Sequence, residues 1–131
     1  MQVADLTTPA VLIDRSRVEN NTHQMAQRAH RLGARLRPHV KTHKCVEIAH
    51  MQVADHFGGI TVSTFAEAEY FAAAGFRDIT LAVPIALSRV PQLLDFSRRM
   101  DAFHLLVDSH RAIEALSAAA HQRRQSVSVF L

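Results

Sequence analysis

Short apolar stretches rich in β-branched residues recur along the chain, and segments with helical periodicity separate them. None of the stretches contains a repeated polar alternation, which favours strands that are buried on both faces. Strands that alternate with helices in this way are typical of a parallel sheet with crossover helices. The predicted strands are ARLRPHV (34–40), GITVST (59–64), DITLAVP (78–84), AFHLLVD (102–108) and SVSVFL (126–131).

The first predicted helix lies ahead of all these strands. Ser16 and Glu19 form a capping-box pattern at its start, and Gly33 occupies the position of a C-terminal cap. One apolar face is expected along this helix, made of Val18, Met25, Ala29 and Leu32.

The other predicted helices follow the strands. Thr64 and Glu67 repeat the capping pattern in front of a helix that reaches Gly75. Three further helices are predicted: one after Lys44 with Val46, Ala49 and Val53 on its apolar face, one after Pro91 with Leu93, Leu94 and Phe96, and one from Asp108 or Ser109 through Leu116 to about His121.

Two architectures fit this pattern. A five-stranded doubly wound sheet suits 131 residues. A (β/α)8 barrel needs about 250 residues, so this chain would form only its first part. The order of strands and helices does not separate the two. SVSVFL (126–131) ends the sequence on an apolar strand with no helix after it to cover one face, so we expect a chain truncated at its C-terminus.

The composition is that of a globular protein, with 48% hydrophobic and 21% charged residues. No apolar stretch approaches the roughly 20 residues that cross a bilayer, and the N-terminus shows no signal-peptide pattern, so we expect no membrane association. A single cysteine, Cys45, excludes an internal disulfide and fits a reducing cytoplasm. The net charge is only +3, and the basic residues are not interleaved with aromatic ones, which disfavours nucleic acid as a partner.

Two lysines, two histidines and an arginine gather in LRPHVKTHK (36–44), where the first predicted strand leaves the core. Chemistry in parallel α/β folds collects at the carboxyl ends of strands, and Lys41 is expected there. A lysine amine in that place can form a Schiff base when it is partly neutral. The positive charges of Arg37 and Lys44 would disfavour its ammonium form. The alternative is an ordinary surface lysine that extends into water. The other residues expected on this rim are Ser63, Thr64, Pro84 and Asp108.

His39 and His43 have the His-x-x-x-His spacing that binds zinc on a helix. Pro38 and the strand pattern before it argue against a helix at this point. No third ligand is evident, although His50 and His56 lie downstream. Polar, solvent-facing histidines are the alternative interpretation. We predict no metal ligand in this chain.

Several longer segments together resemble the D-threonine aldolase and D-serine dehydratase-like group of alanine-racemase-type (fold type III) pyridoxal-phosphate enzymes. The segments are TPAVLID, VENN, LRPHVKTHKCVEIAHMQ, GGITVSTFAEAEYFAAAGFRDITLAVPI and LLVDS. The resemblance covers about residues 8–131. RPHVKTHK is its most specific part, and the T-x-x-EAE pattern after the second predicted strand supports it independently.

The resemblance implies roles for individual residues. Lys41 matches the lysine that holds pyridoxal 5'-phosphate as a Schiff base, and it is the candidate catalytic residue. His39 and the Thr42–His43 pair match positions around this cofactor. Thr64 lies where the second strand faces the cofactor, although helix capping alone also explains a threonine there. Residues interpreted as cap or surface positions are Glu67, Glu69 and Asp108.

The resemblance also implies how the chain is organised. Residues 1–131 would form the N-terminal part of a (β/α)8 TIM barrel, about its first five parallel strands with their helices. PAVLID resembles a strand that joins a second, β-rich C-terminal domain, which is absent here. In the family, later barrel loops bind the cofactor phosphate, and the second domain holds a divalent metal, manganese or zinc. We expect neither set of ligands in this chain.

The activity implied is that of a lyase acting on small D-β-hydroxy-amino acids, in an enzyme expected to be a homodimer. KTHKC and EIA resemble the aldolases slightly more, which favours D-threonine aldolase activity, the cleavage to glycine and an aldehyde. D-serine dehydratase activity is the alternative. The truncated chain alone is expected to have little activity.

Two other classes of function remain open. One is a non-catalytic half-barrel that binds pyridoxal phosphate and has free strand edges. The other is a five-stranded receiver-like signalling domain. The receiver ranks last, because its first strand would end in paired acidic residues rather than in Pro38, His39 and Lys41.

Overall fold

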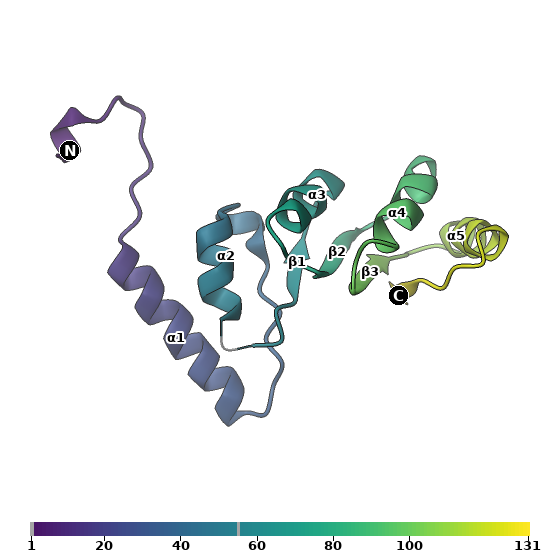
Figure 1. Ribbon diagram of the computed structural model, residues 1–131, viewed down its shortest axis with the longest axis horizontal. Helices are drawn as coiled ribbons and strands as arrows, with labels where there is room; N and C mark the ends of the chain where they lie inside the picture. Colours follow the sequence, from purple (N-terminus) through teal and green to yellow (C-terminus); the bar gives the residue numbers. More distant parts are fainter. Residues whose placement is uncertain (1, 55) are drawn as a thin grey trace.

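The computed structural model describes residues 2–54 and 56–131 (Figure 1). In chain order, its elements are η1 (Val3–Asp5), α1 (Arg15–Arg31), η2 (Val40–Thr42), α2 (Val46–Val53), β1 (Ile60–Val62), α3 (Phe65–Ala73), β2 (Asp78–Pro84), η3 (Leu87–Arg89), α4 (Val90–Ser97), β3 (Ala102–Leu106), α5 (His110–Gln122) and β4 (Ser128–Phe130).

The four strands form one parallel sheet in the order β1-β2-β3-β4. A doubly wound sheet reverses its strand order at a switch point, whereas a barrel places each new strand beside the previous one. The sequential order is therefore that of the first part of a barrel. This finding confirms the predicted partial (β/α)8 architecture over the doubly wound alternative.

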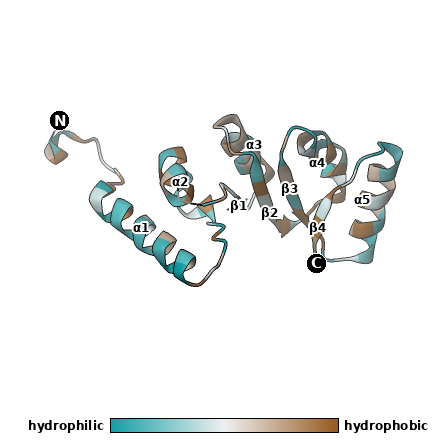
Figure 2. Cartoon of the chain, turned by 60° about the horizontal axis from the view of Figure 1, so that its bottom comes forward, coloured by the Kyte–Doolittle hydropathy of each residue, from teal (hydrophilic) through white to brown (hydrophobic). Residues whose placement is uncertain are grey.

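The hydrophobic core lies between the sheet and the helices that follow its strands (Figures 1 and 2). Right-handed crossovers that all advance in one direction place their helices on the same face of the sheet. The strand residues buried in this core are Ile60, Val62, Ile79, Leu81, Phe103 and Leu105. Helix α3 contributes Ala68 and Phe71, and α4 contributes Leu93, Leu94 and Phe96.

The opposite face of the sheet carries a row of polar side chains. Thr61 pairs with Thr80, Thr80 with His104, and His104 with Ser128, so these residues lie side by side across all four strands. The prediction of strands without polar alternation is therefore wrong. Each strand is short and has one polar residue in this row, flanked by apolar residues that face the helices, so the period of two is visible only after the strands are aligned.

The predicted strand at 34–40 is reduced to a single bridge between His39 and Thr61, which corrects the predicted count of five strands. The carbonyl of Pro38 accepts a hydrogen bond of 2.8 Å from the N–H of Thr61. Pro38 itself has no N–H to donate, and the chain turns into η2 at Val40, so no regular ladder forms.

Helix α1 begins two positions earlier than the capping box predicts. Asp14 is its N-cap and accepts from the N–H of Arg17, whereas Glu19 pairs with Arg15 at 2.7 Å instead of closing a box with Ser16. Gly33 follows the helix with φ of 61°, as a glycine at a C-terminal cap does.

The predicted apolar face of α1 is also partly wrong. Met25 and Leu32 are 50% and 71% exposed, whereas Ala26 and Ala29 are buried. Helix α1 packs on α2 rather than on the sheet, and small side chains permit that close contact. The buried stripe is therefore centred on alanines.

The remaining helix predictions are confirmed. Thr64 caps α3, and Gly75 follows that helix with φ of 96°. Of the two candidates before α5, Ser109 is the cap and accepts from the N–H of Ala112, so Asp108 has no capping role. Helices α2 and α4 bury the predicted Ala49 and the predicted Leu93, Leu94 and Phe96.

The segment PAVLID has no strand partner among the described residues. Val11, Leu12 and Ile13 are 92%, 61% and 56% exposed, and Figure 1 shows this segment extending away from the rest of the molecule. Within the described part of the chain, no helix has the length and apolar character that crossing a bilayer requires.

Candidate functional site

The turn η2 carries Lys41 just beyond the sheet. Val40, fully buried, anchors the turn in the core. Because His39 is in register with Thr61, Lys41 lies level with Ser63, at the carboxyl end of β1. Its side chain is exposed and makes no ion pair with any residue that the structure describes. The structure therefore places Lys41 where the sequence predicts a reactive amine.

His39 lies between Lys41 and the end of β1. Its Nδ1 is 3.3 Å from the backbone nitrogen of Lys41, and its Nε2 is 3.3 Å from Ser63 Oγ. Burial lowers the pKa of His39, the positive charge of Lys41 lowers it further, and Glu67 opposes them. A neutral ring suits these contacts, because Nδ1 must accept a hydrogen bond from the N–H of Lys41.

Lys44 is engaged in a different way from Lys41. Its Nζ lies 3.0 Å from Glu67 Oε1, and the other carboxylate oxygen accepts the N–H of Ser63 at 2.8 Å. Burial raises the pKa of Glu67, but the Ser63 N–H and the Lys44 ammonium outweigh it, so the pKa lies below its ordinary value. Glu67 is therefore held as a carboxylate.

Arg37 is also paired. It forms a bidentate contact with Asp78, at 2.7 and 3.1 Å, and donates to the carbonyl of Ile60. The two positive charges that the sequence places around Lys41, on Arg37 and Lys44, are thus each paired with a carboxylate, Asp78 and Glu67. Only the tertiary structure brings these carboxylates to the basic segment.

His43 faces α2. Its Nε2 is 3.0 Å from Gln52 Oε1, and its Nδ1 accepts the N–H of Cys45 at 3.0 Å. Both ring nitrogens are thus occupied by contacts that hold the start of α2. His39 and His43 therefore make separate sets of contacts, although the sequence places both in one candidate site.

Pro84 is the last residue of β2, and Thr64 and Asp108 come just after β1 and β3, so all three lie at the carboxyl ends of neighbouring strands, as predicted for a common rim. Thr64 and Pro84 line the same open cavity of about 300 Å³, which also includes Ile85 and Leu93. Thr64 Oγ accepts the N–H of Glu67, so its role as a helix cap is confirmed. Asp108 is exposed.

Glu67 has more contacts than the sequence predicts. The sequence predicts a cap or surface residue, yet Glu67 is 8% exposed and binds both the N–H of Ser63, at the β1–α3 junction, and Lys44. Glu69 is exposed, as expected. The T-x-x-E pattern is the signal that could have identified Glu67, but its pairing with Lys44 is visible only in the tertiary structure.

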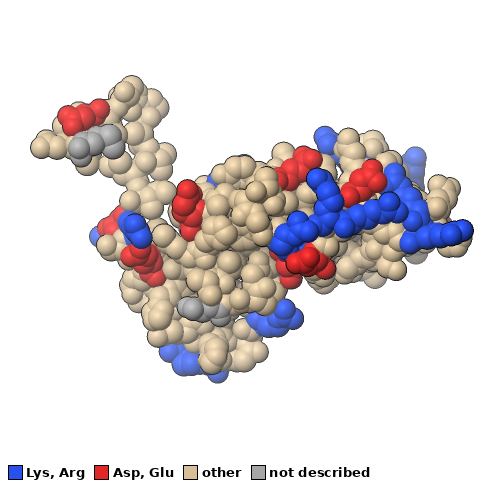
Figure 3. All heavy atoms as spheres, viewed as in Figure 1, with Lys and Arg blue, Asp and Glu red and all other residues tan. Residues whose placement is uncertain are grey.

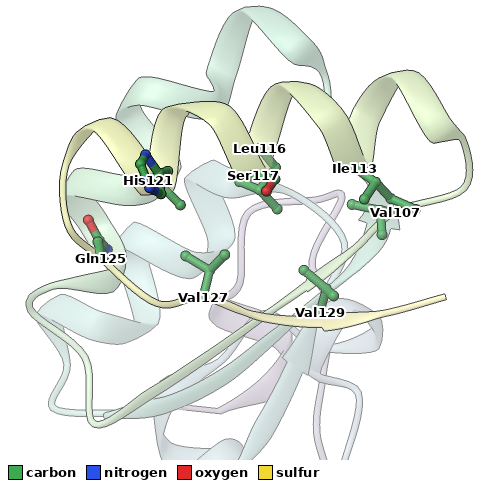
Figure 4. A pocket seen from close by; sticks show the side chains of 9 residues that line it. Val107, Ile113, Leu116, Ser117, His121, Gln125, Val127 and Val129 are labelled. Atoms are coloured by element: carbon green, nitrogen blue, oxygen red, sulfur yellow. The ribbon is translucent and has the colours of Figure 1, made fainter.

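The cavity between α5 and β4 has a different lining. It has a volume of about 350 Å³ and mostly apolar walls, including Val107, Leu116 and Val129, and no lysine or carboxylate lines it (Figure 4). Among the described residues, no three His, Cys, Asp or Glu side chains gather as metal ligands would.

Basic side chains are prominent on the part of the surface formed by the C-terminal half of the chain (Figure 3). Several arginines in that half bind other groups of the protein. Arg123 pairs with Asp95 at 2.6 Å, and Arg98 donates to the carbonyl of Arg123. Arg98 thereby binds a carbonyl at the C-terminal end of α5, where a cationic side chain is stabilising.

Comparison with known proteins agrees with the fold described above. A family model described as alanine racemase, N-terminal domain, matches residues 13–131. The chain is 45% identical over 126 residues to D-threo-3-hydroxyaspartate dehydratase of Delftia sp. (strain HT23), covering 96% of this chain and 33% of that protein. The solved structure of that dehydratase superimposes with a TM-score of 0.89 and 46% identity, over 95% of this chain and 33% of that one.

Two further relatives are named for other activities. D-serine dehydratase of Dictyostelium discoideum is 34% identical, over 87% of this chain and 30% of that protein. D-threonine aldolase of Arthrobacter sp. is 32% identical, over 98% of this chain and 34% of that protein. The chain thus spans about a third of the length of these relatives. The preference for aldolase drawn from KTHKC and EIA is not confirmed, since a dehydratase is the more similar protein.

Proposed function

Because the chain belongs to the alanine racemase N-terminal domain family, we propose that it forms the lysine-bearing part of a pyridoxal-phosphate-dependent lyase. The substrates would be small D-β-hydroxy-amino acids, as the names of its relatives suggest. Lys41 is the proposed catalytic residue and the point of cofactor attachment.

The difference between Lys41 and Lys44 carries this proposal. Both lysines lie in the same segment, but Lys44 is bound to the buried Glu67, whereas Lys41 is exposed and has no carboxylate partner in the described part of the chain. A covalent bond to a carbonyl group requires an amine that can lose its proton and reach the ligand. Lys41 can reach a ligand without breaking an ion pair among the described residues, whereas Lys44 would first have to break its pair with Glu67.

The described residues fit the lysine side of the cofactor. Lys41 Nζ would hold its aldehyde carbon, and His39 fixes the turn from which Lys41 projects. Thr64 has a hydroxyl hydrogen free to donate, since its oxygen accepts the N–H of Glu67. His43, the other residue predicted beside the cofactor, has both ring nitrogens engaged by Gln52 and the N–H of Cys45, so it offers no free nitrogen to the cofactor. When bound, pyridoxal phosphate supplies an electron sink for charge that develops at Cα of an amino acid.

For the reaction we favour dehydration over retro-aldol cleavage. The chain is 45% identical to a dehydratase and 32% identical to an aldolase. Dehydration of a 3-hydroxy-amino acid removes a proton from Cα and hydroxide from Cβ, and hydrolysis of the resulting enamine releases ammonia and a 2-oxo acid. Retro-aldol cleavage, the second candidate, breaks the Cα–Cβ bond and releases glycine and an aldehyde.

The complete activity is proposed for a protein in which further segments accompany this barrel part, because the chain spans about a third of its relatives. Those segments would hold the cofactor phosphate and a divalent metal, manganese or zinc. No residue described here is proposed as a ligand of that metal. A homodimer and a cytoplasmic location are likewise proposals.

Covalent trapping tests the role of Lys41. The purified chain is mixed with pyridoxal phosphate, reduced with borohydride, and digested so that peptide masses locate the modified lysine. We expect the label on Lys41, its loss in Lys41→Arg, and its retention in the matched variant Lys44→Arg. Equal labelling of Lys41 and Lys44, the two lysines of the chain, or a label that persists in Lys41→Arg, would contradict the proposal.

Product analysis of a protein that contains the chain and the further segments separates the two reactions. Release of ammonia and a 2-oxo acid from D-threo-3-hydroxyaspartate would support dehydration. Release of glycine and acetaldehyde from D-threonine would favour the aldolase instead.

A further inference from the structure

One short segment, residues 63–67 at the junction of β1 and α3, holds the turn that carries Lys41 at two points. On one side, Ser63 Oγ contacts the ring of His39, which in turn accepts the backbone N–H of Lys41. On the other side, Glu67 pairs with Lys44. Glu67 also accepts the N–H of Ser63, so the two points of contact are joined.

The proton positions on His39 follow from these contacts. A neutral imidazole has one N–H and one acceptor nitrogen. Since Nδ1 accepts the N–H of Lys41, the proton is on Nε2, which donates to Ser63 Oγ. A protonated ring would have no acceptor for the N–H of Lys41, so this contact requires the neutral ring.

The groups around His39 favour that neutral ring. Two charged groups act on the pKa of His39. Lys41 on η2 lowers this pKa, Glu67 on α3 raises it, and Lys41 has the larger effect. A cavity of about 340 Å³ next to His39 has no charged side chain in its wall, which consists of Asn21, Thr22, Met25, Leu36, Pro38 and Gln52.

The backbone of Lys44 adds independent evidence that the turn is held in place. Lys44 has φ of 49°, in the left-handed region that residues with a Cβ atom seldom adopt. Such a conformation persists where surrounding contacts hold it. Here the contacts are the hydrogen bond of 2.9 Å from the N–H of Lys44 to the carbonyl of Val40 and the pair between Lys44 Nζ and the buried carboxylate of Glu67.

We infer that Ser63 and Glu67 are positioning residues, which hold the Val40–Thr42 turn so that it presents the amine of Lys41. Ser63 acts through His39, and Glu67 acts through Lys44. The importance of the turn rests on the function proposed above for Lys41. The hydrogen bonds that hold the turn are present in the structure whatever that function is.

Hydrogen exchange without cofactor tests the positioning directly. The protection factor of the Lys41 amide is measured in Ser63→Ala and in Glu67→Gln, which retains an acceptor for the Ser63 N–H but loses the charge. We expect protection to fall about three- to tenfold in each, as for the loss of one hydrogen bond. The matched controls are Ser109→Ala, which removes a different helix cap, and Glu69→Gln, an exposed change on the same helix.

The pH profile separates positioning from a general loss of stability. In the natural chain, protection of the Lys41 amide should be lost as the pH falls and His39 becomes protonated. Ser63→Ala should flatten this profile, and Ser63→Thr, which keeps the hydroxyl, should restore it. A natural profile in Ser63→Ala, or equal loss of protection in the two control variants, would overturn the inference.

Borohydride trapping with pyridoxal phosphate completes the test. Ser63→Ala and Glu67→Gln should slow labelling of Lys41 relative to their controls. If the natural chain shows no label on Lys41, the proposed function fails. The exchange measurements would still decide whether Ser63 and Glu67 hold the turn.

Discussion

Lys44 Nζ lies 3.0 Å from Glu67 Oε1, in a pair whose carboxylate is buried and whose ammonium is largely exposed. Two contributions to stability therefore oppose each other at Lys44. The ion pair stabilises the fold, and the left-handed backbone with φ of 49° destabilises it. Glycine and methionine at this position separate the two contributions, because only glycine relieves the backbone.

We expect Lys44→Met to lower the free energy of unfolding by about 1 kcal/mol, since Glu67 loses its partner while solvent screens the exposed half of the pair. Lys44→Gly loses the same pair but adopts the left-handed backbone at little cost. It should therefore be the more stable of the two variants, by up to about 1 kcal/mol. Urea denaturation measures both, and a glycine variant less stable than the methionine variant would contradict this account.

Arg37 and Asp78 form the second pair that secures the basic segment, with two parallel hydrogen bonds in a half-buried site. Lysine cannot reproduce this bidentate geometry. We expect Arg37→Lys to lower the free energy of unfolding by roughly 1 to 3 kcal/mol, because a partly buried carboxylate loses hydrogen bonds.

The control for Arg37 is Arg35→Lys, an exposed arginine two positions earlier that lies over the ring of Phe57. It should change stability much less than Arg37→Lys. A double-mutant cycle of Arg37→Lys with Asp78→Asn should show coupling between the two residues, and additive effects would argue against the pair.

His104 makes stability depend on pH. Burial lowers its pKa from the ordinary 6.5, Arg37 lowers it further, and Asp78 opposes them. The folded protein thus holds His104 neutral, whereas the unfolded chain takes up a proton as the pH falls through about 6.5. Stability is therefore complete above that pH and is lost as the pH falls toward the folded-state pKa. His39, whose pKa is also lowered, acts in the same direction.

Urea midpoints measured between about pH 7.5 and pH 5.5 should fall with pH in the natural chain. Glutamine at position 104 cannot be protonated in this range, so the urea midpoint should fall less with pH in His104→Gln. The control His30→Gln changes an exposed histidine and should show the same fall of the midpoint as the natural chain. An unchanged pH dependence in His104→Gln would show that this histidine does not contribute.

Thr80 carries a buried hydroxyl without a hydrogen-bond partner among the described residues. Valine has nearly the same shape and no polar group to desolvate. We expect Thr80→Val to raise the free energy of unfolding by roughly 1 kcal/mol.

Thr61→Val is the matched control for Thr80, because Thr61 lies beside Thr80 in the sheet but is only half-buried. Thr61→Val should change the free energy of unfolding by close to zero. A destabilised Thr80→Val would show that a water molecule satisfies the Thr80 hydroxyl in solution.

The sequence alone was sufficient for most of the secondary structure. Strand β2 and the caps at Thr64 and Gly75 occur where predicted, because local patterns of capping and apolar periodicity produce them. The predictions failed where two local signals competed, as at Asp14 and Ser16. They also failed at Met25 and Leu32, where the tertiary partner is a helix rather than a sheet.

The same distinction between local patterns and tertiary contacts applies to the candidate site. Lys41 could be identified from its neighbours in RPHVKTHK and from the expected end of a strand, and the structure places it on that rim. The partners of Arg37 and Lys44 could not be identified, because Asp78 and Glu67 are 41 and 23 positions away in sequence. No local pattern specifies which carboxylate neutralises which cation.

What the sequence by itself determined is therefore the alternation of strands and helices and the lysine after the first predicted strand, which the structure reduces to a bridge at His39. Strand order, and with it the choice between barrel and doubly wound sheet, was decided only by the tertiary structure, because each strand has apolar residues that could pair with several neighbours. The tertiary structure also decided that Lys41, rather than Lys44, is left without a carboxylate partner among the described residues. That outcome depends on the position of Glu67 on α3, which brings a buried carboxylate to one lysine and not to the other.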